Sequence, residues 1–268
     1  MPNATAYKTL RIEKRGAADW LTLDRPERLN AFNATMIEEM NDYFDRLMCD
    51  PSVRVVVMRG AGRHFCAGVD IKEMDSLVGN GVAPDLYGQK RISEVIVKMR
   101  RCPQPIMALV HGAATGGGFA LALAADMRIA GDSAKMNCAF IKLGLTSCDM
   151  GLSYILPRLV GIAHAATLMY TGRFIGAERA AAIGLVCEAV ADAELERTAE
   201  TYVEDMLATG PLGLRMTKDG LNRAIEASNL EAAIAIEDRN QVLTLNGPDY
   251  REGMAAFLEK RKPVWPGL

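Results

Sequence analysis

Residues 106–125, IMALVHGAATGGGFALALAA, form a run of twenty residues without Lys, Arg, Asp or Glu, and this run limits the possible folds most strongly. Its length would suit a membrane-spanning helix. However, the three consecutive glycines at 116–118 would weaken one continuous helix. Two prolines just before the run favour an extended backbone at its start. The sequence therefore predicts a buried strand over 106–110, a glycine turn, and a buried helix over 117–125.

The composition indicates a globular protein. The chain has 268 residues, of which 50% are hydrophobic and 24% charged, enough for one large domain or two modest ones. Its 31 Lys and Arg against 33 Asp and Glu argue against a nucleic-acid or membrane partner. Six cysteines without a Cys-x-x-Cys pair, and only three histidines, predict neither a disulfide framework nor a metal site. Because no signal peptide is visible, we expect a cytoplasmic protein.

Alternating and periodic apolar residues predict an α/β core. Residues 8–14 and 19–23 alternate as an antiparallel pair would, and Asn33 can cap the helix that follows. The later expected elements are a strand over 53–58, a loop over 79–84, a helix over 86–100, a strand over 126–130, a helix over 151–170 and a strand over 185–190.

The chain changes character at about Asp192, where Ala, Glu, Arg and Met at helical spacing predict three or four helices. Leu230, Ile234 and Val242 place apolar side chains on more than one helical face. Such a helix must be covered by the core or by another subunit. We therefore divide the chain into a core over 1–191 and a helical region over 192–268 that forms an oligomer.

Two glycine-rich loops follow predicted strands, at 59–70 (RGAGRHFCAGVD) and 111–118 (HGAATGGG). The first loop does not match the dinucleotide-binding motif, because Phe65 occupies the position of the motif's third glycine or alanine. The sequence also lacks the Gly-Lys-Ser/Thr of a phosphate-binding P-loop. Glycines let backbone N–H groups approach a ligand, and a helix beginning at Gly117 adds its positive dipole end. The loops therefore form an oxyanion hole or only allow close packing of helix on sheet.

Ordered motifs along nearly the whole chain resemble the crotonase (enoyl-CoA hydratase/isomerase) superfamily. They are Arg25-Pro26-x-x-x-Asn30-Ala31, FCAGVDIKEM at 65–74, HGAATGGGFALALAADMRIA at 111–130, LPRLVG at 156–161 and AFLEKRKP at 256–263. The resemblance implies a ββα spiral core with a C-terminal helical oligomerisation region, as a homotrimer or a dimer of trimers. It also implies an acyl-CoA substrate, with coenzyme A as part of that substrate and no separate cofactor.

In this superfamily the thioester oxygen accepts two backbone hydrogen bonds, which the resemblance assigns to the N–H groups of Val69 and Gly117. An enolate or tetrahedral oxyanion carries more charge on that oxygen than the thioester does, so each donor can contribute about 3–4 kcal/mol to transition-state stabilisation. The resemblance also implies contacts to coenzyme A from Arg28, Ala67, Lys72, Phe257 and Lys260, the last two in a neighbouring subunit's site.

The sequence departs from the hydratases it resembles at both catalytic glutamates, whose positions hold Ala120 and Phe140. Neither residue can transfer a proton, so hydration by two glutamates is not expected. The nearest replacement is Asp149, in a segment similar to chlorobenzoyl-CoA dehalogenases, where an aspartate is a nucleophile, and to dienoyl-CoA isomerases, where one moves protons. Phe140 and Ser93 stand where the dehalogenases have tryptophan and histidine, which disfavours dehalogenation.

Asp149 has two interpretations from sequence alone. It is an acid/base or nucleophile, or it is the N-cap of a helix beginning near Met150. Hydrogen bonds at a helix start would lower its pKa, whereas burial against Phe140 and Leu145 would raise it and favour proton transfer. His64, His111, Cys148 and Glu94 are weaker candidates.

We expect isomerisation, carbon–carbon cleavage or hydrolysis in preference to hydration. The alternative is an acyl-CoA-binding protein, or an RNA-binding homologue, that has lost catalysis.

Overall fold

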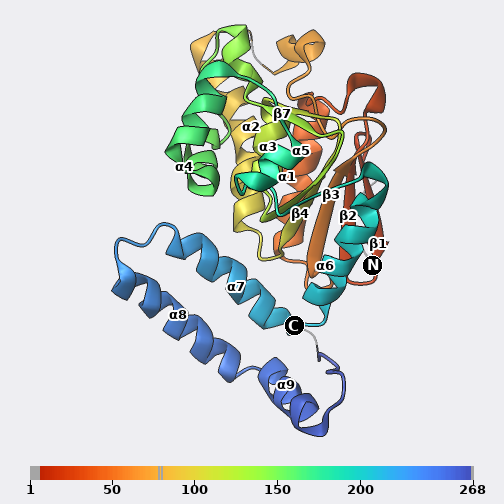
Figure 1. The fold of residues 1–268 in the computed structure, drawn as a ribbon, viewed down its shortest axis with the longest axis vertical. Coiled ribbons are helices and arrows are strands. Elements are labelled where there is room, and N and C mark those ends of the chain that lie inside the picture. Colours follow the sequence, from red (N-terminus) through yellow and green to blue (C-terminus); the bar gives the residue numbers. More distant parts are fainter. Residues whose placement is uncertain (1–6, 78, 80, 267–268) are drawn as a thin grey trace.

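A computed structural model describes residues 7–77, 79 and 81–266, and its core is a mostly parallel sheet (Figure 1). The strand order is β1-β2-β3-β4-β6-β9. The strands are β1 (Leu10–Arg15), β2 (Ala18–Leu23), β3 (Val55–Gly60), β4 (Ile106–Val110), β6 (Met127–Gly131) and β9 (Glu188–Val190). β1 and β2 pair antiparallel, as predicted, and the other neighbours pair parallel.

A second, smaller sheet has the order β5-β7-β8 and was not predicted from the sequence. Its strands are β5 (Ala113–Thr115), β7 (Lys135–Asn137) and β8 (Ile175–Gly176). Strands of two or three residues are too short to show an alternating pattern, which explains the omission. β5 connects β4 to the helix that follows the glycine triplet, so this small sheet positions the second glycine loop.

Helices α1 (Ala34–Met48), α2 (Val82–Arg101), α3 (Gly117–Ala124), α4 (Leu152–Thr171) and α5 (Ala177–Ala182) belong to the core region. Asn33 caps α1 as predicted, since its side chain accepts a hydrogen bond from the Met36 amide at 3.0 Å. α2 begins at Val82 and not at Leu86, because a proline in the first turn of a helix, here Pro84, is tolerated. The predicted loop over 79–84 was therefore partly wrong, and residue 80 lies outside the described residues.

The two faces of the large sheet are covered differently. α1, α2 and α3 pack on one face and contribute to the larger apolar cluster, whereas α6 (Leu195–Leu207) lies against β3, β4 and β6 on the other (Figure 1). α3 is buried along its whole length, which confirms the buried strand and the buried helix predicted within 106–125, whereas part of the predicted glycine turn forms β5.

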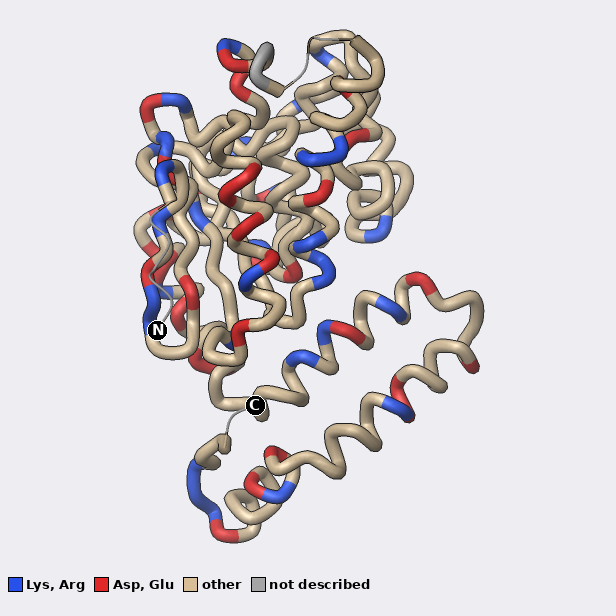
Figure 2. The backbone as a smooth tube through the Cα atoms, turned by 180° about the vertical axis from the view of Figure 1, so that it is seen from behind, with Lys and Arg blue, Asp and Glu red and all other residues tan. Residues whose placement is uncertain are grey.

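The remaining C-terminal helices α7 (Pro211–Ala224), α8 (Leu230–Leu245) and α9 (Pro248–Glu259) form an arm beside the core (Figure 1). α7 is joined to the core by the buried Lys218, which donates to the carbonyls of Met99 at 3.0 Å and Gln104 at 2.8 Å. Together with α6, these three helices make four α-helices after Asp192 within the described residues, in agreement with the three or four predicted there. Leu230 and Val242 of α8 are exposed in the single chain, so coverage of the arm by another subunit stays a prediction. Charges of both signs alternate along the arm (Figure 2).

Within the described residues, α4 is long and apolar enough to cross a membrane by length and composition alone. Core helices of water-soluble proteins meet the same criterion, so this evidence is weak. Leu152, Leu156 and Ala165 of α4 are buried in the protein core. Burial accounts for the apolar residues on one face of α4, while Ile162 and Tyr170 on this helix are exposed.

Candidate active site

The first glycine loop is held by the side chain of Asn30, which is completely buried. Its Oδ1 accepts a hydrogen bond from the Arg25 amide at 2.9 Å, and its Nδ2 donates to the carbonyls of Ala61 at 2.9 Å and His64 at 2.7 Å. One side chain thus ties the turn after β2 to the loop after β3. The sequence motif contained Asn30, but this role was missed.

A buried ion pair fixes the end of the same loop. The Arg25 guanidinium donates to Asp70 Oδ2 at 3.2 Å, to Glu73 Oε1 at 2.6 Å and to the Ala31 carbonyl at 2.7 Å. Arg25 and Asp70 are both less than a tenth exposed. Since Asp70 follows Val69 directly, the ion pair restrains the backbone that carries the Val69 amide.

The two glycine loops lie against one another. The Cys66 amide donates to the Ala113 carbonyl at 3.0 Å, and the Thr115 amide donates to the Cys66 carbonyl at 3.0 Å. A Cβ atom added at Gly118 would lie 2.0 Å from the Cys66 carbonyl oxygen. The glycine at this position therefore allows the start of α3 to approach the first loop, so the packing role predicted for the triplet is present.

The same contact brings two backbone amides together. Gly68 has a φ of +93°, and a Cβ there would lie 3.3 Å from the Gly117 amide nitrogen. Val69 follows Gly68, so its amide is next to that of Gly117. Within the described part of the chain, neither the Val69 nor the Gly117 N–H has a hydrogen-bond acceptor. Two adjacent, unpaired donors are what an oxyanion hole requires.

A cavity of about 590 Å³ opens in front of these amides and is lined by Ala67, Val69, Gly117 and Asp149. Much of its remaining wall is apolar, formed by Ile71, Met74, Leu77, Ile92, Phe140, Leu143, Leu145 and Phe174. Among the described residues that line the cavity, Asp149 is the one carboxylate. The other charged side chains there, Lys142 and Arg173, are both exposed.

Asp149 is not the N-cap of α4, so that interpretation was wrong. α4 begins at Leu152 and its N-cap residue is Gly151. Asp149 Oδ1 instead accepts hydrogen bonds from the Met150 amide at 2.7 Å and from Gln89 Nε2 at 2.6 Å. Its Oδ2 has no hydrogen-bond partner within the described residues.

Burial raises the pKa of the Asp149 carboxyl above its usual value, and this effect exceeds the lowering by the hydrogen bonds from Met150 and Gln89. A higher pKa makes a carboxylate a stronger base. Met150 is buried with a φ of +46°, and a Cβ at Gly117 would lie 3.2 Å from its sulfur atom. This packing keeps Asp149 close to the second amide.

The two positions that hold glutamates in the hydratases supply no acid here. Ala120 is buried inside α3, and Phe140 places its ring in the cavity wall. A Cβ at Gly116 would be 3.6 Å from that ring, which locates Phe140 beside the second glycine loop. Asp149 is therefore the candidate proton-transfer group of this cavity.

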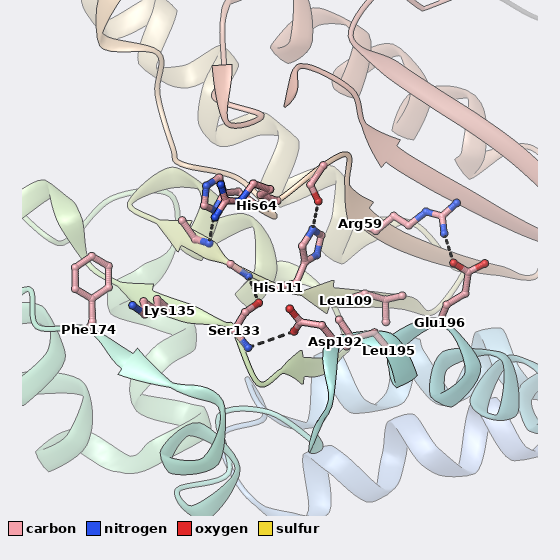
Figure 3. Close-up of a pocket in the computed structure, with 14 residues that line it drawn as sticks. Arg59, His64, Leu109, His111, Ser133, Lys135, Phe174, Asp192, Leu195 and Glu196 are labelled. Atoms are coloured by element: carbon pink, nitrogen blue, oxygen red, sulfur yellow. Dashed lines mark hydrogen bonds and ion pairs between the residues drawn. The ribbon is translucent and has the colours of Figure 1, made fainter. Parts of the chain in front are cut away.

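A larger cavity, of about 810 Å³, lies elsewhere and is lined by His64 and His111 (Figure 3). His64 Nδ1 accepts a hydrogen bond from the Ala113 amide at 3.0 Å, and His111 Nε2 lies 3.1 Å from the Gly62 carbonyl. Both histidines thus support loop backbone. This cavity is not lined by Val69 or Gly117, and we do not assign the active site to it in spite of its size.

The predicted coenzyme A contacts are only partly brought together. Ala67 lines the 590 Å³ cavity, whereas Arg28 and Lys72 do not line it, although Lys72 lies just after the Val69 loop. Phe257 and Lys260 lie on the arm, at the end of α9, away from the core (Figure 1). Neither residue lines the cavity of its own chain, so contact with coenzyme A through a second subunit stays a prediction.

Two unpaired backbone amides and a half-buried carboxylate share one cavity of this α/β core, an arrangement that can accommodate a carbonyl group. The chain belongs to the enoyl-CoA hydratase/isomerase family of the crotonase superfamily, because the model of that family matches residues 13–267. It is therefore an acyl-CoA-processing enzyme of this superfamily, and the sequence-based prediction of family and fold is confirmed.

Individual relatives and structures agree with this assignment. The chain is 38% identical over 250 residues to "Probable enoyl-CoA hydratase echA12" of Mycobacterium bovis, covering 91% of this chain and 88% of the relative. It is 36% identical over 249 residues to 1,2-epoxyphenylacetyl-CoA isomerase of Escherichia coli, covering 92% and 94%. The crystal structure of enoyl-CoA hydratase from Bacillus anthracis superposes with a TM-score of 0.92 at 30% identity, covering 97% and 100%.

Proposed function

We propose that the protein isomerises an acyl-CoA by moving a proton to and from carbon, with coenzyme A as part of the substrate. The Val69 and Gly117 amides hold the thioester oxygen, and Asp149 is the general base and then the general acid. The observation that carries this proposal is that, among the described residues, one carboxylate of raised pKa lines the cavity that is also lined by the residues of both unpaired amides.

The proposed reaction balances without any other reactant. Asp149 removes a proton from C2 of a 3-enoyl thioester, and the electron pair of that C–H bond forms a dienolate whose charge lies largely on the thioester oxygen. The two amides stabilise this charge. The protonated Asp149 then returns the proton to C4, which leaves a conjugated 2-enoyl thioester. The raised pKa supports both steps, since the same group must accept and release the proton.

Hydration fits the site less well. It needs a base for water and an acid for the α-carbon, and Ala120 and Phe140 supply neither. One relative is named as an isomerase and another as a hydratase, so their names do not decide between the two. The apolar wall around Phe140 and Leu143 suits an acyl group without charge. Carbon–carbon cleavage and hydrolysis would use the same oxyanion hole and are outcomes of the test.

The test uses 3-hexenoyl-CoA as a probe in D2O, with products followed by mass spectrometry and by the absorbance of the conjugated thioester. We expect isomerisation, with deuterium at C4 to the extent that protonated Asp149 exchanges with D2O before it returns the proton, and a loss of at least about a hundredfold in Asp149→Asn. Lys90→Met, at an exposed position of α2, is the control and should retain the rate.

Full activity of Asp149→Asn would refute the role of the carboxylate. If the wild type binds CoA esters but neither exchanges nor converts any of them, the protein is an acyl-CoA-binding module. Products of thioester hydrolysis or carbon–carbon cleavage would contradict isomerisation but would remain consistent with the proposed oxyanion hole.

A further inference from the structure

Gln89 is the one side chain among the described residues that donates a hydrogen bond to the Asp149 carboxylate. It lies on α2, sixty residues away in sequence, and its Nε2 donates to Asp149 Oδ1 at 2.6 Å. Gln89 is half-buried and lines the cavity in front of the two amides. Nothing in the sequence motifs marks this glutamine.

The two hydrogen bonds to Asp149 reach the same oxygen. The Met150 amide also donates to Oδ1, but it belongs to the next residue and moves with Asp149. The bond from Gln89 comes from a separate helix, so it restrains rotation of the carboxyl group relative to the cavity. Oδ2 is left without a hydrogen bond to the described residues and is therefore the oxygen available to a substrate proton.

We propose that Gln89 is a positioning residue that holds Oδ1 of Asp149 and thereby presents Oδ2 as the single proton-transferring oxygen. This inference rests on the proposed role of Asp149 and adds to it a requirement for orientation. A misplacement of a reacting group by about an ångström can cost a hundredfold in rate. A neutral amide suits this task, because it orients the carboxylate without adding a positive charge that would weaken it as a base.

Other polar groups near this pair are not equivalent. Ser93 Oγ lies 3.5 Å from Gln89 Nε2, at the limit of a hydrogen bond, and no hydrogen bond joins it to Asp149 among the described residues. Lys142 and Arg173 line other parts of the cavity wall and are exposed. Water screens such exposed charges, which leaves Gln89 as the group whose removal most directly frees the carboxylate.

The test replaces Gln89 by methionine, which has similar length and helix propensity but no donor. Isomerisation of 3-hexenoyl-CoA is measured over a range of pH for wild type, Gln89→Met, Asp149→Asn and the control Lys90→Met. We expect Gln89→Met to lower kcat at least about tenfold with little change in KM. The acid limb of kcat/KM should move to higher pH by about one pH unit, since a hydrogen bond to the ionised form is lost.

The outcomes separate the two proposals. If Asp149→Asn is inactive but Gln89→Met keeps the wild-type kcat and acid limb, the positioning role is wrong and the proposed function stands. If Asp149→Asn is fully active, the proposed function is wrong, and the positioning role of Gln89, which depends on it, is wrong as well. A fall in kcat without movement of the acid limb, accompanied by a lower melting temperature, would assign Gln89 a purely structural role and overturn the inference.

Discussion

Phe32 brackets Val69 with two backbone hydrogen bonds. The Phe32 amide donates to the Gly68 carbonyl at 2.7 Å, and the Phe32 carbonyl accepts from the Asp70 amide at 2.8 Å. Phe32 and Val69 form a parallel β-bridge, in which Phe32 hydrogen-bonds to the residues on either side of Val69 and not to Val69 itself. The Val69 N–H therefore points away from Phe32. The segment before α1 therefore orients one of the two amides that face the cavity.

Gly68→Ala should impair catalysis through this backbone geometry. A Cβ at Gly68 would lie 2.7 Å from the Thr115 carbonyl oxygen, and its φ of +93° is strained for alanine. The Val69 amide must then shift away from the position of the thioester oxygen. We expect kcat/KM for 3-hexenoyl-CoA to fall at least about tenfold, since loss of an oxyanion donor costs about a hundredfold or more.

The matched control for Gly68→Ala is Gly176→Ala. Gly176 has a negative φ of −89°, and its added Cβ would have the Ala134 carbonyl oxygen, 3.9 Å away, as its nearest contact. This variant should keep the wild-type kcat/KM. Equal rates for both variants would show that the Val69 amide does not need its present position.

Asn30→Ala should destabilise the fold by about 3 kcal/mol, because it leaves the Arg25 amide and the Ala61 and His64 carbonyls without their buried partner. Urea denaturation measures this change. The exposed Asn246→Ala is the control and should stay within about 0.5 kcal/mol of wild type. A loss for Asn30→Ala as small as that of the control would contradict the role of Asn30 in holding the loop.

Much of this scaffold was predictable because it depends on long, regular patterns. The buried run at 106–125 predicted β4 and α3 correctly, and Asn33 predicted the start of α1. β5, β7 and β8 could not be found, since they consist of two or three residues stabilised by pairing between distant segments. Their existence depends on tertiary structure alone.

The site was predictable where it depends on backbone and less so where it depends on side chains. The motifs placed Val69 and Gly117 in glycine loops, and the structure brings them into one cavity. Whether Asp149 caps a helix depended on where α4 begins, which is three residues beyond Asp149. Gln89 carries no signal of its own, because glutamine on a helix is usually a surface residue.

Asp149 should reduce stability at neutral pH. Its pKa is raised in the folded state, so the native protein binds more protons than the unfolded chain between the two pKa values, and stability falls as the pH rises through that interval. Asp149→Asn removes this cost and keeps an oxygen that can accept from Gln89 and Met150. We expect the variant to be more stable than wild type at about pH 7, with the difference vanishing at about pH 3.

The same shift predicts the pH dependence of activity. In the proposed mechanism the carboxylate form of Asp149 is the active base, so kcat/KM should decrease as the pH falls through a value above the usual aspartate pKa of about 3.9. Thermal unfolding checks the predicted pH dependence of stability, and initial rates measured in the same buffers check the predicted pH dependence of activity. A wild-type protein more stable than Asp149→Asn at neutral pH would contradict the effect of burial on this group.

Crotonyl-CoA should be a poor substrate for hydration. Because general acid/base groups contribute about a hundredfold or more each, the absence of carboxylates at Ala120 and Phe140 should make hydration at least about a hundredfold slower than isomerisation of 3-hexenoyl-CoA. Loss of the conjugated thioester absorbance measures hydration. Comparable rates for the two reactions would show that the missing carboxylates do not limit this enzyme.

Lys260→Met should raise KM for CoA esters if the arm of one subunit completes the site of its neighbour. Lys260 lies at the end of α9, away from the cavity of its own chain, so its charge can act there only across a subunit boundary. We expect a severalfold higher KM for 3-hexenoyl-CoA and no change for the N-acetylcysteamine thioester, which lacks the phosphates that a lysine would contact.

Mixed oligomers identify the chain that supplies Lys260. If the chain forms the predicted oligomer, co-expression of Lys260→Met with Asp149→Asn should place the intact Lys260 of an Asp149→Asn chain at the site of a neighbour whose Asp149 is intact. Such mixtures should contain sites with the wild-type KM, whereas Lys260→Met alone contains none. If every site in the mixture keeps the higher KM, Lys260 acts within its own chain and the arm does not reach a neighbouring cavity.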